Sequence, residues 1–220
     1  MRNIRTEGII IKRRNLGEAD RLLTVITPYY GKITIKAAGV RKITSRRAAH
    51  TELLNRTTLN LYKGKGMHVL TEANMLDDFA AIKLDFSKVG IAYHLCELVD
   101  GLCPENQENS KVFYLLKNTL MQLTGEEYVT QLPKVAVQAD IDDYTLGTFG
   151  IGVSDAVKKL PEQIKRYSSQ TVHDFEIALL SELGYWDKTD ALSQNFDTHT
   201  MIENILERKL KSRSMFSKLQ

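Results

Sequence analysis

Basic residues gather in two clusters near the N-terminal end of the chain. The first cluster is Lys12, Arg13 and Arg14, and the second lies between residues 41 and 47. An arginine guanidinium pairs with phosphate through two parallel hydrogen bonds, and lysine adds a compact positive charge. We therefore interpret both clusters as candidate contacts for a polyanion. With three further lysines, the candidate binding residues are Lys12, Arg13, Arg14, Lys32, Arg41, Lys42, Arg46, Arg47, Lys63 and Lys65.

Acidic residues offer a competing chemistry. Asp140, Asp142 and Asp143 lie close enough in sequence to hold a metal ion for a nuclease reaction. A calcium loop that began at Asp140 would need glycine at its sixth position and glutamate at its twelfth. Thr145 and Ile151 occupy those places, so a solvated acidic loop fits better. The five histidines are scattered and form no recognisable nucleophile motif, and we expect no enzymatic activity.

The net charge of +3 is distributed unevenly along the 220 residues. Residues 1–80 carry 15 Lys/Arg against 7 Asp/Glu, whereas residues 81–207 carry 10 against 20. The last thirteen residues carry five basic residues and none that is acidic. Such asymmetry indicates two parts with different tasks, the first of them facing an anion. The basic end either stabilises the negative end of a helix, extends the anion path or receives an acidic partner segment.

Residues 1–78 predict a small β-barrel. Segments rich in β-branched residues lie at about 4–13, 20–27, 31–40, 53–62 and 67–73, and Pro28 to Gly31 form a turn between the second and third. Five short strands predict a closed or nearly closed OB-fold, with an SH3-like barrel as the alternative. OB-folds bind ligands with the loops between strands 1 and 2 and between strands 4 and 5. Here those loops carry Arg13 and Arg14, and Lys63 and Lys65.

Residues 79–220 predict an all-α domain, because apolar residues recur there with helical spacing. Ser110 is a candidate N-cap, and Gly184 stands where a helix often ends. Cys96 and Cys103 are expected to be reduced thiols packed in the core. The helices are predicted at about 79–100, 110–123, 126–138, 154–166, 172–183 and 199–213, with a loop at 140–152.

Several motifs resemble those of the bacterial RecO family of recombination mediators. The resemblance is dense over about the first 75 residues and patchy beyond them. It is carried by Glu7-Gly8-Ile9, Lys12-Arg13-Arg14, Gly17-Glu18-Ala19-Asp20-Arg21-Leu22-Leu23-Thr24, Gly31-Lys32, Gly39-Val40-Arg41-Lys42, Leu70-Thr71-Glu72-Ala73, Phe175-Glu176 and Leu183-Gly184-Tyr185. The resemblance implies an N-terminal OB-fold, a helical C-terminal domain, binding to single- and double-stranded DNA and annealing of complementary strands.

The resemblance also implies partners and one difference from the family. Family members contact a RecR-like mediator protein and the acidic tail of single-strand-binding protein, and they help to load recombinase onto DNA. Many carry two Cys-x-x-Cys pairs beyond the position that matches Tyr185, but this chain has no cysteine after Cys103. A structural zinc site of this type needs four such ligands, so we expect neither zinc nor any other cofactor.

The sequence thus supports the hypothesis of a non-enzymatic DNA repair and recombination mediator. No apolar run approaches the roughly 20 residues of a membrane helix, and the N-terminus lacks an apolar signal segment. We therefore expect a cytoplasmic, nucleoid-associated protein that contacts no membrane. Two alternatives stay open: a module that binds RNA or another polyanion, and a metal-dependent nuclease that uses the aspartates at 140–143.

Overall fold

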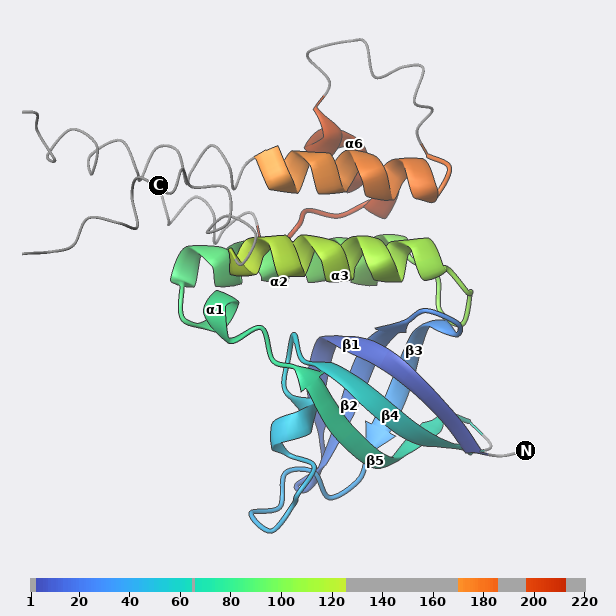
Figure 1. The fold of residues 1–220 in the computed structure, drawn as a ribbon. Coiled ribbons are helices and arrows are strands. Elements are labelled where there is room, and N and C mark those ends of the chain that lie inside the picture. Colours follow the sequence, from blue (N-terminus) through green and yellow to red (C-terminus); the bar gives the residue numbers. More distant parts are fainter. Residues whose placement is uncertain (1–2, 65, 126–169, 186–196, 213–220) are drawn as a thin grey trace, which may run out of the picture.

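The N-terminal part of the chain folds into a five-stranded barrel (Figure 1). The computed structural model describes residues 3–64, 66–125, 170–185 and 197–212. The strands are β1 (Asn3–Leu16), β2 (Asp20–Thr27), β3 (Gly31–Ala37), β4 (Arg56–Lys63) and β5 (His68–Asp77). They close in the order β1-β2-β3-β5-β4, with only the β3–β5 pair parallel among these strands. The predicted barrel of the OB type is confirmed.

Alternating apolar side chains fill the barrel. Leu23 and Val25 of β2 and Ile33 and Ile35 of β3 are buried inside it, together with Leu59 of β4. Successive side chains of a strand point to opposite faces, so the residues between them lie on the outside. This alternation fixes the register, because a slip by one residue would turn the apolar set toward water.

The first strand is long because it pairs with two neighbours in succession. Its first half pairs with β4 and its second half with β2, and Ile9 has a partner in both, Arg56 and Ile26. The register with β2 shifts between Ile10 and Lys12. A bulge of this kind bends a strand and increases its twist, which helps the sheet to close.

The helices stack on one end of the barrel in two layers (Figure 1). The first layer holds α1 (Ala80–Lys83), α2 (Phe86–Leu102) and α3 (Ser110–Thr124). The second holds the helix over 170–182 and α6 (Thr198–Leu206). One apolar cluster joins the layers to the barrel, since it combines Ile9, Ile26 and Leu54 with Phe113 of α3 and Phe175 of the outer layer.

The barrel and the helices approach each other closely at the turn between β2 and β3. Gly31 has a φ of +63°, and a Cβ atom there would overlap the backbone carbonyl of Gln107. Asn106 donates its backbone N–H to the carbonyl of Lys32 at 2.8 Å. Glycine is therefore required at this turn both for its backbone angle and for the close approach of the loop between α2 and α3.

The structure corrects several predicted boundaries. The helix predicted at 79–100 is two helices, and Asp85 caps the second by accepting hydrogen bonds from the backbone N–H groups of Ser87 and Lys88. The N-cap of α3 is Asn109 and not Ser110, since the Asn109 side chain accepts from Val112 N. The last helix ends at Leu206 rather than near 213. The segments predicted at 126–138, 140–152 and 154–166 lie outside the described residues.

The two cysteines lie as the sequence predicts. Cys96 and Cys103 are free thiols buried in the core, and burial raises the pKa of Cys96 to about 12. Over the part of the chain that the structure describes, no helix combines the length and the apolar character of a membrane span.

Candidate nucleic-acid interface

The turn between β1 and β2 is joined to the segment that follows β3. The Arg41 backbone N–H donates to the carbonyl of Ala19 at 2.9 Å, and its guanidinium donates to the carbonyl of Gly17 at 2.8 Å. Gly39 N–H donates to Oδ1 of Asp20 at 2.8 Å. These bonds hold the segment against the turn, so Arg41 and Lys42 of the second cluster lie beside the end of β1 that carries Arg14.

Strand register places two cations on the outer face beside this turn. Arg14 lies opposite Leu22, and Leu22 lies opposite Lys36. Directly paired residues share a face of the sheet, and the neighbours Leu23 and Ile35 point into the barrel. Adjacent strands lie about 4.8 Å apart, so the backbones of Arg14 and Lys36 are separated by about 10 Å.

The Asp20 carboxylate pairs with Lys36 and also feels the charge of Lys42. Lys36 Nζ lies 3.0 Å from Oδ2 of Asp20. The hydrogen bond from Gly39 N–H, the hydrogen bond from Lys36 and the nearby charges of Lys36 and Lys42 lower the pKa of the Asp20 carboxyl. We call Arg14, Lys36, Arg41 and Lys42 the basic edge. Arg14, Arg41 and Lys42 are exposed, and none of them pairs with a carboxylate among the described residues.

Two of the predicted residues face the helices instead. Lys32 is only 7% exposed, and its Nζ donates to the backbone carbonyl of Asp100 at 2.5 Å and lies 3.8 Å from the Asp100 carboxylate. Lys12 Nζ lies 2.5 Å from the same carboxylate. Because α2 carries Asp100, both lysines neutralise an acid at the junction between barrel and helices.

Two predicted arginines hold local structure. Arg13 forms an ion pair with Glu52, and Glu52 also accepts a hydrogen bond from Arg21 at 2.9 Å. Arg13 and Arg14 lie within β1 and not in the predicted loop, which begins only after Leu16. The Arg47 guanidinium donates to the carbonyls of Leu70 at 2.6 Å and Ala38 at 2.8 Å, and so ties the segment after β3 to the barrel.

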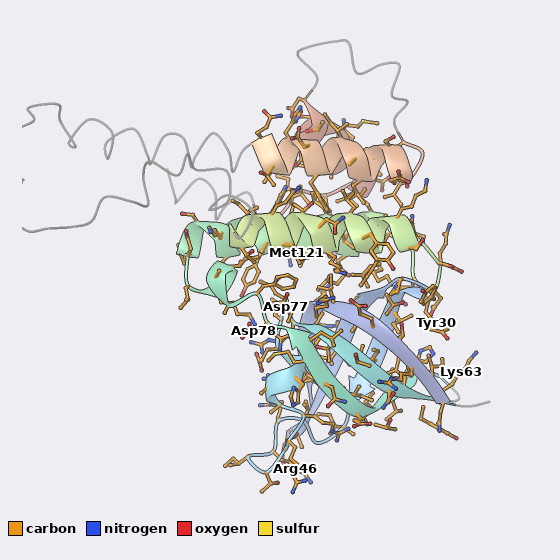
Figure 2. All side chains as sticks on the ribbon, viewed as in Figure 1. Tyr30, Arg46, Lys63, Asp77, Asp78 and Met121 are labelled. Atoms are coloured by element: carbon orange, nitrogen blue, oxygen red, sulfur yellow. The ribbon has the colours of Figure 1, made fainter. Side chains whose placement is uncertain are left out.

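The remaining predicted residues lie apart from one another. Arg46 projects from the tip of the segment that follows β3, and Lys63 lies across the same end of the barrel from it (Figure 2). Both side chains are exposed. Lys65 lies outside the described residues, as do Asp140, Asp142 and Asp143. The described members of the predicted set therefore do not converge on a single groove.

Lys36 is not among the candidate binding residues predicted from the sequence, although the alternation of β3 indicates that it faces outward. Lys32, Thr34 and Lys36 alternate with Ile33 and Ile35, which assigns all three polar residues to one face. The sequence did not show that the loop after α2 covers the Lys32 end of that face and leaves the Lys36 end open.

Two exposed tyrosines lie away from the basic edge. Tyr29 and Tyr30, in the turn between β2 and β3, are 64% and 39% exposed. Figure 2 shows Tyr30 near the junction with the helices, far from Arg46. These two rings are therefore not placed to stack on bases bound at the basic edge.

Comparison with known proteins matches both parts of the chain to one family. Family models described as recombination protein O N terminal and recombination protein O C terminal match residues 1–79 and 83–140. A DNA repair protein RecO from Roseiflexus sp. (strain RS-1) is 44% identical over 121 residues, which cover 55% of this chain and 42% of that protein. The same-named protein of Heliobacterium modesticaldum is 38% identical over 133 residues, 60% of this chain and 46% of the relative. The chain thus aligns with less than half of the length of these relatives.

Proposed function

Because this chain belongs to the RecO family, we propose that it acts in DNA repair by binding DNA along the basic edge of its barrel. The observation that carries the proposal is the position of Arg14, Arg41 and Lys42. All three are exposed at one edge of the barrel, next to Lys36 and without a described carboxylate partner. The relatives bear the name DNA repair protein.

The proposed mechanism uses charge neutralisation and no covalent step. Lysine and arginine side chains displace the counterions that surround DNA phosphates, and their release favours binding. Two DNA strands with neutralised phosphates repel each other less, so complementary strands pair more readily. The same exchange lets recombinase replace single-strand-binding protein on the DNA. The helical part, which is acidic, recruits a RecR-like protein, and the basic C-terminal residues receive the acidic tail of single-strand-binding protein.

Salt dependence of binding tests the proposal. The triple variant Arg14→Ala/Arg41→Ala/Lys42→Ala is titrated against a fluorescent single-stranded oligonucleotide at several salt concentrations, with anisotropy as the readout. Each lost phosphate contact should flatten the slope of log affinity against log salt by about 0.7, or about 2 for all three. The matched control, Arg5→Ala/Lys111→Ala/Lys117→Ala, loses the same charge at other sites and should keep the slope of the unmodified protein.

Two results would contradict the proposal. One is an unchanged slope in the triple variant, and the other is an equal loss of slope in the control. Competition with transfer RNA separates DNA binding from general polyanion binding. Incubation of labelled DNA with Mg²⁺ should leave its length unchanged, because the proposed mechanism cleaves no bond.

A further inference from the structure

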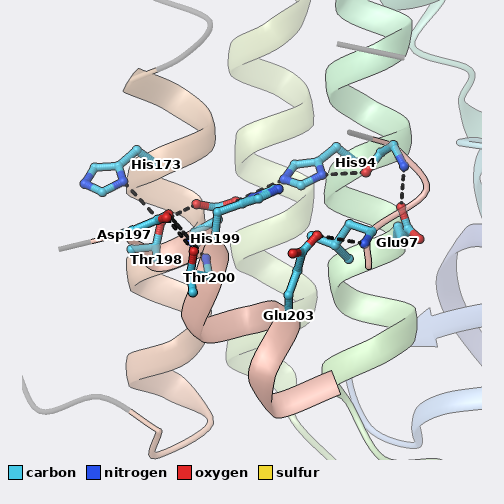
Figure 3. Close-up of polar contacts among 11 residues, drawn as sticks. His94, Glu97, His173, Asp197, Thr198, His199, Thr200 and Glu203 are labelled. Carbon is cyan, nitrogen blue, oxygen red and sulfur yellow. Dashed lines mark hydrogen bonds and ion pairs between the residues drawn. The ribbon is translucent and has the colours of Figure 1, made fainter. Parts of the chain in front are cut away.

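Three residues from separate helices meet inside the helical part, and Figure 3 labels two of them, His94 and His199. His94 lies on α2, Glu176 on the helix over 170–182 and His199 on α6. His94 Nε2 lies 3.1 Å from Oε1 of Glu176, and His199 Nδ1 lies 3.3 Å from the same oxygen. All three ligand atoms lie within 4.8 Å of one another. We propose that His94, Glu176 and His199 bind a divalent transition-metal ion, with zinc as the best match to these donors.

The spacing of the donor atoms fits zinc. Zinc binds imidazole nitrogen and carboxylate oxygen at about 2.0–2.2 Å in a tetrahedral arrangement, which places neighbouring ligand atoms about 3.3 Å apart. Two of the three separations already have that value within 0.2 Å, at 3.1 and 3.3 Å. Small side-chain rotations would bring the third pair to the same spacing. Two histidines with one glutamate form a donor set found in zinc proteins.

Hydrogen bonds behind the ligands hold them in place. His94 uses its second nitrogen, Nδ1, to hydrogen-bond with Ser212 Oγ at 2.7 Å. The Thr198 hydroxyl donates to Oε2 of Glu176 at 2.5 Å, which leaves Oε1 turned toward the histidines. Outer partners of this kind fix the ring orientation and the tautomer of histidine ligands in metal sites.

The segment that carries Ser212 is anchored to two helices. Glu97 of α2 accepts hydrogen bonds from the backbone N–H groups of Ser212 at 2.8 Å and Lys211 at 2.9 Å. Glu203 of α6 accepts from the backbone N–H of Leu210 at 3.1 Å (Figure 3). The chain after α6 is thus drawn back against α2, and this places the Ser212 hydroxyl behind His94.

Burial and charge suit a site with one open position. His94 and Glu176 are 1% and 3% exposed, whereas the His199 side chain is 25% exposed. Glu176 supplies the one carboxylate oxygen of the donor set, beside two imidazole nitrogens. Three protein ligands leave a fourth position for water on the His199 side.

The missing cysteines do not oppose this site. The lack of cysteine after Cys103 removes a thiolate site, but imidazole and carboxylate ligands suffice for zinc. The proposed ligands are 82 residues apart between His94 and Glu176 and 23 apart between Glu176 and His199. Metal binding would therefore connect distant segments of the chain and stabilise the packing of three helices against one another.

Zinc binding by the full chain tests the proposal. The protein is stripped with a chelator, dialysed and titrated with Zn²⁺ alone against a chromophoric zinc competitor. The unmodified protein should bind one zinc ion and gain thermal stability. Co²⁺ in place of zinc should give the visible absorption of a four-coordinate site. Even the loss of an outer-shell partner weakens metal affinity about 10–100-fold, so His199→Ala should weaken zinc binding at least to that extent.

Control variants separate this site from other histidines and from misfolding. His68→Ala removes a histidine of the barrel and should leave zinc affinity unchanged. Glu176→Gln keeps the size of the side chain but removes its charge, and should abolish the Co²⁺ absorption while circular dichroism confirms the fold. The proposal is overturned if the unmodified protein binds no zinc, or if His199→Ala binds zinc as tightly as His68→Ala. In either case the three residues form only a hydrogen-bonded cluster.

Discussion

Replacing Asp100 with asparagine should destabilise the protein, because this carboxylate neutralises a nearly buried lysine. The side chains of Lys32 and Asp100 are only 9% and 18% exposed. Removal of one partner from a buried ion pair costs about 3–5 kcal/mol, whereas an exposed pair contributes about 0.2–1 kcal/mol. Lys32 would keep its hydrogen bond to the Asp100 backbone carbonyl at 2.5 Å, so we expect a loss between these limits, about 2–3 kcal/mol.

Urea denaturation followed by far-ultraviolet circular dichroism measures this loss. The double variant Asp100→Asn/Lys32→Met should recover more than half of it, since an apolar side chain leaves no unpaired charge. Glu105→Gln is the matched control, because Glu105 also faces β3 but is exposed and accepts only a hydrogen bond from Thr34 at 3.1 Å. Such a surface change should alter the free energy of unfolding by about 0.5 kcal/mol or less.

A small loss of stability in Asp100→Asn would refute this reasoning. If Asp100→Asn costs no more than Glu105→Gln, then Lys32 does not depend on Asp100 for its charge. If Lys32 is structural, as we expect, Lys32→Met leaves the salt slope of DNA binding unchanged.

Two further predictions concern a turn and a helix cap. Gly31→Ala should lower the free energy of unfolding by more than about 2 kcal/mol, since it adds overlap with Gln107 to left-handed strain of about 1–2 kcal/mol. Gly17→Ala, at a φ of +60° with nothing within 4 Å, should cost only the strain. Equal losses of stability in chemical denaturation would exclude the overlap. Asn109→Ala should lower the free energy of unfolding by about 1 kcal/mol through loss of the α3 cap, whereas Ser110→Ala should leave it nearly unchanged. A larger loss in Ser110→Ala than in Asn109→Ala would make Ser110 the cap.

The barrel could be predicted from sequence because its signals are local. Alternating apolar residues in β2 and β3 define one buried face, and the turn from Pro28 to Gly31 separates the strands. The helix boundaries were harder where neighbouring residues offer similar chemistry. Asn109 and Ser110 are both good N-caps, and only the structure shows which side chain accepts from Val112.

The candidate site could be predicted only in part. Basic residues near the turn between β1 and β2 were identified from charge alone, and Arg14, Arg41 and Lys42 are indeed exposed there. The role of Lys32 could not be predicted in this way, because its partner Asp100 lies 68 residues farther along the chain. Contacts of that range depend on how helices pack on the barrel, which local pattern does not reveal. The cluster of His94, Glu176 and His199 escaped notice for the same reason.

Lysine footprinting tests the central claim, that DNA lies along the basic edge, most directly. The protein is acetylated with and without a single-stranded oligonucleotide, and mass spectrometry measures the modification of each lysine. We predict that DNA protects Lys36 and Lys42, while Lys111 and Lys117 on α3 react equally in both samples. Protection of Lys111 and Lys117, with Lys36 and Lys42 unaffected by DNA, would contradict the account.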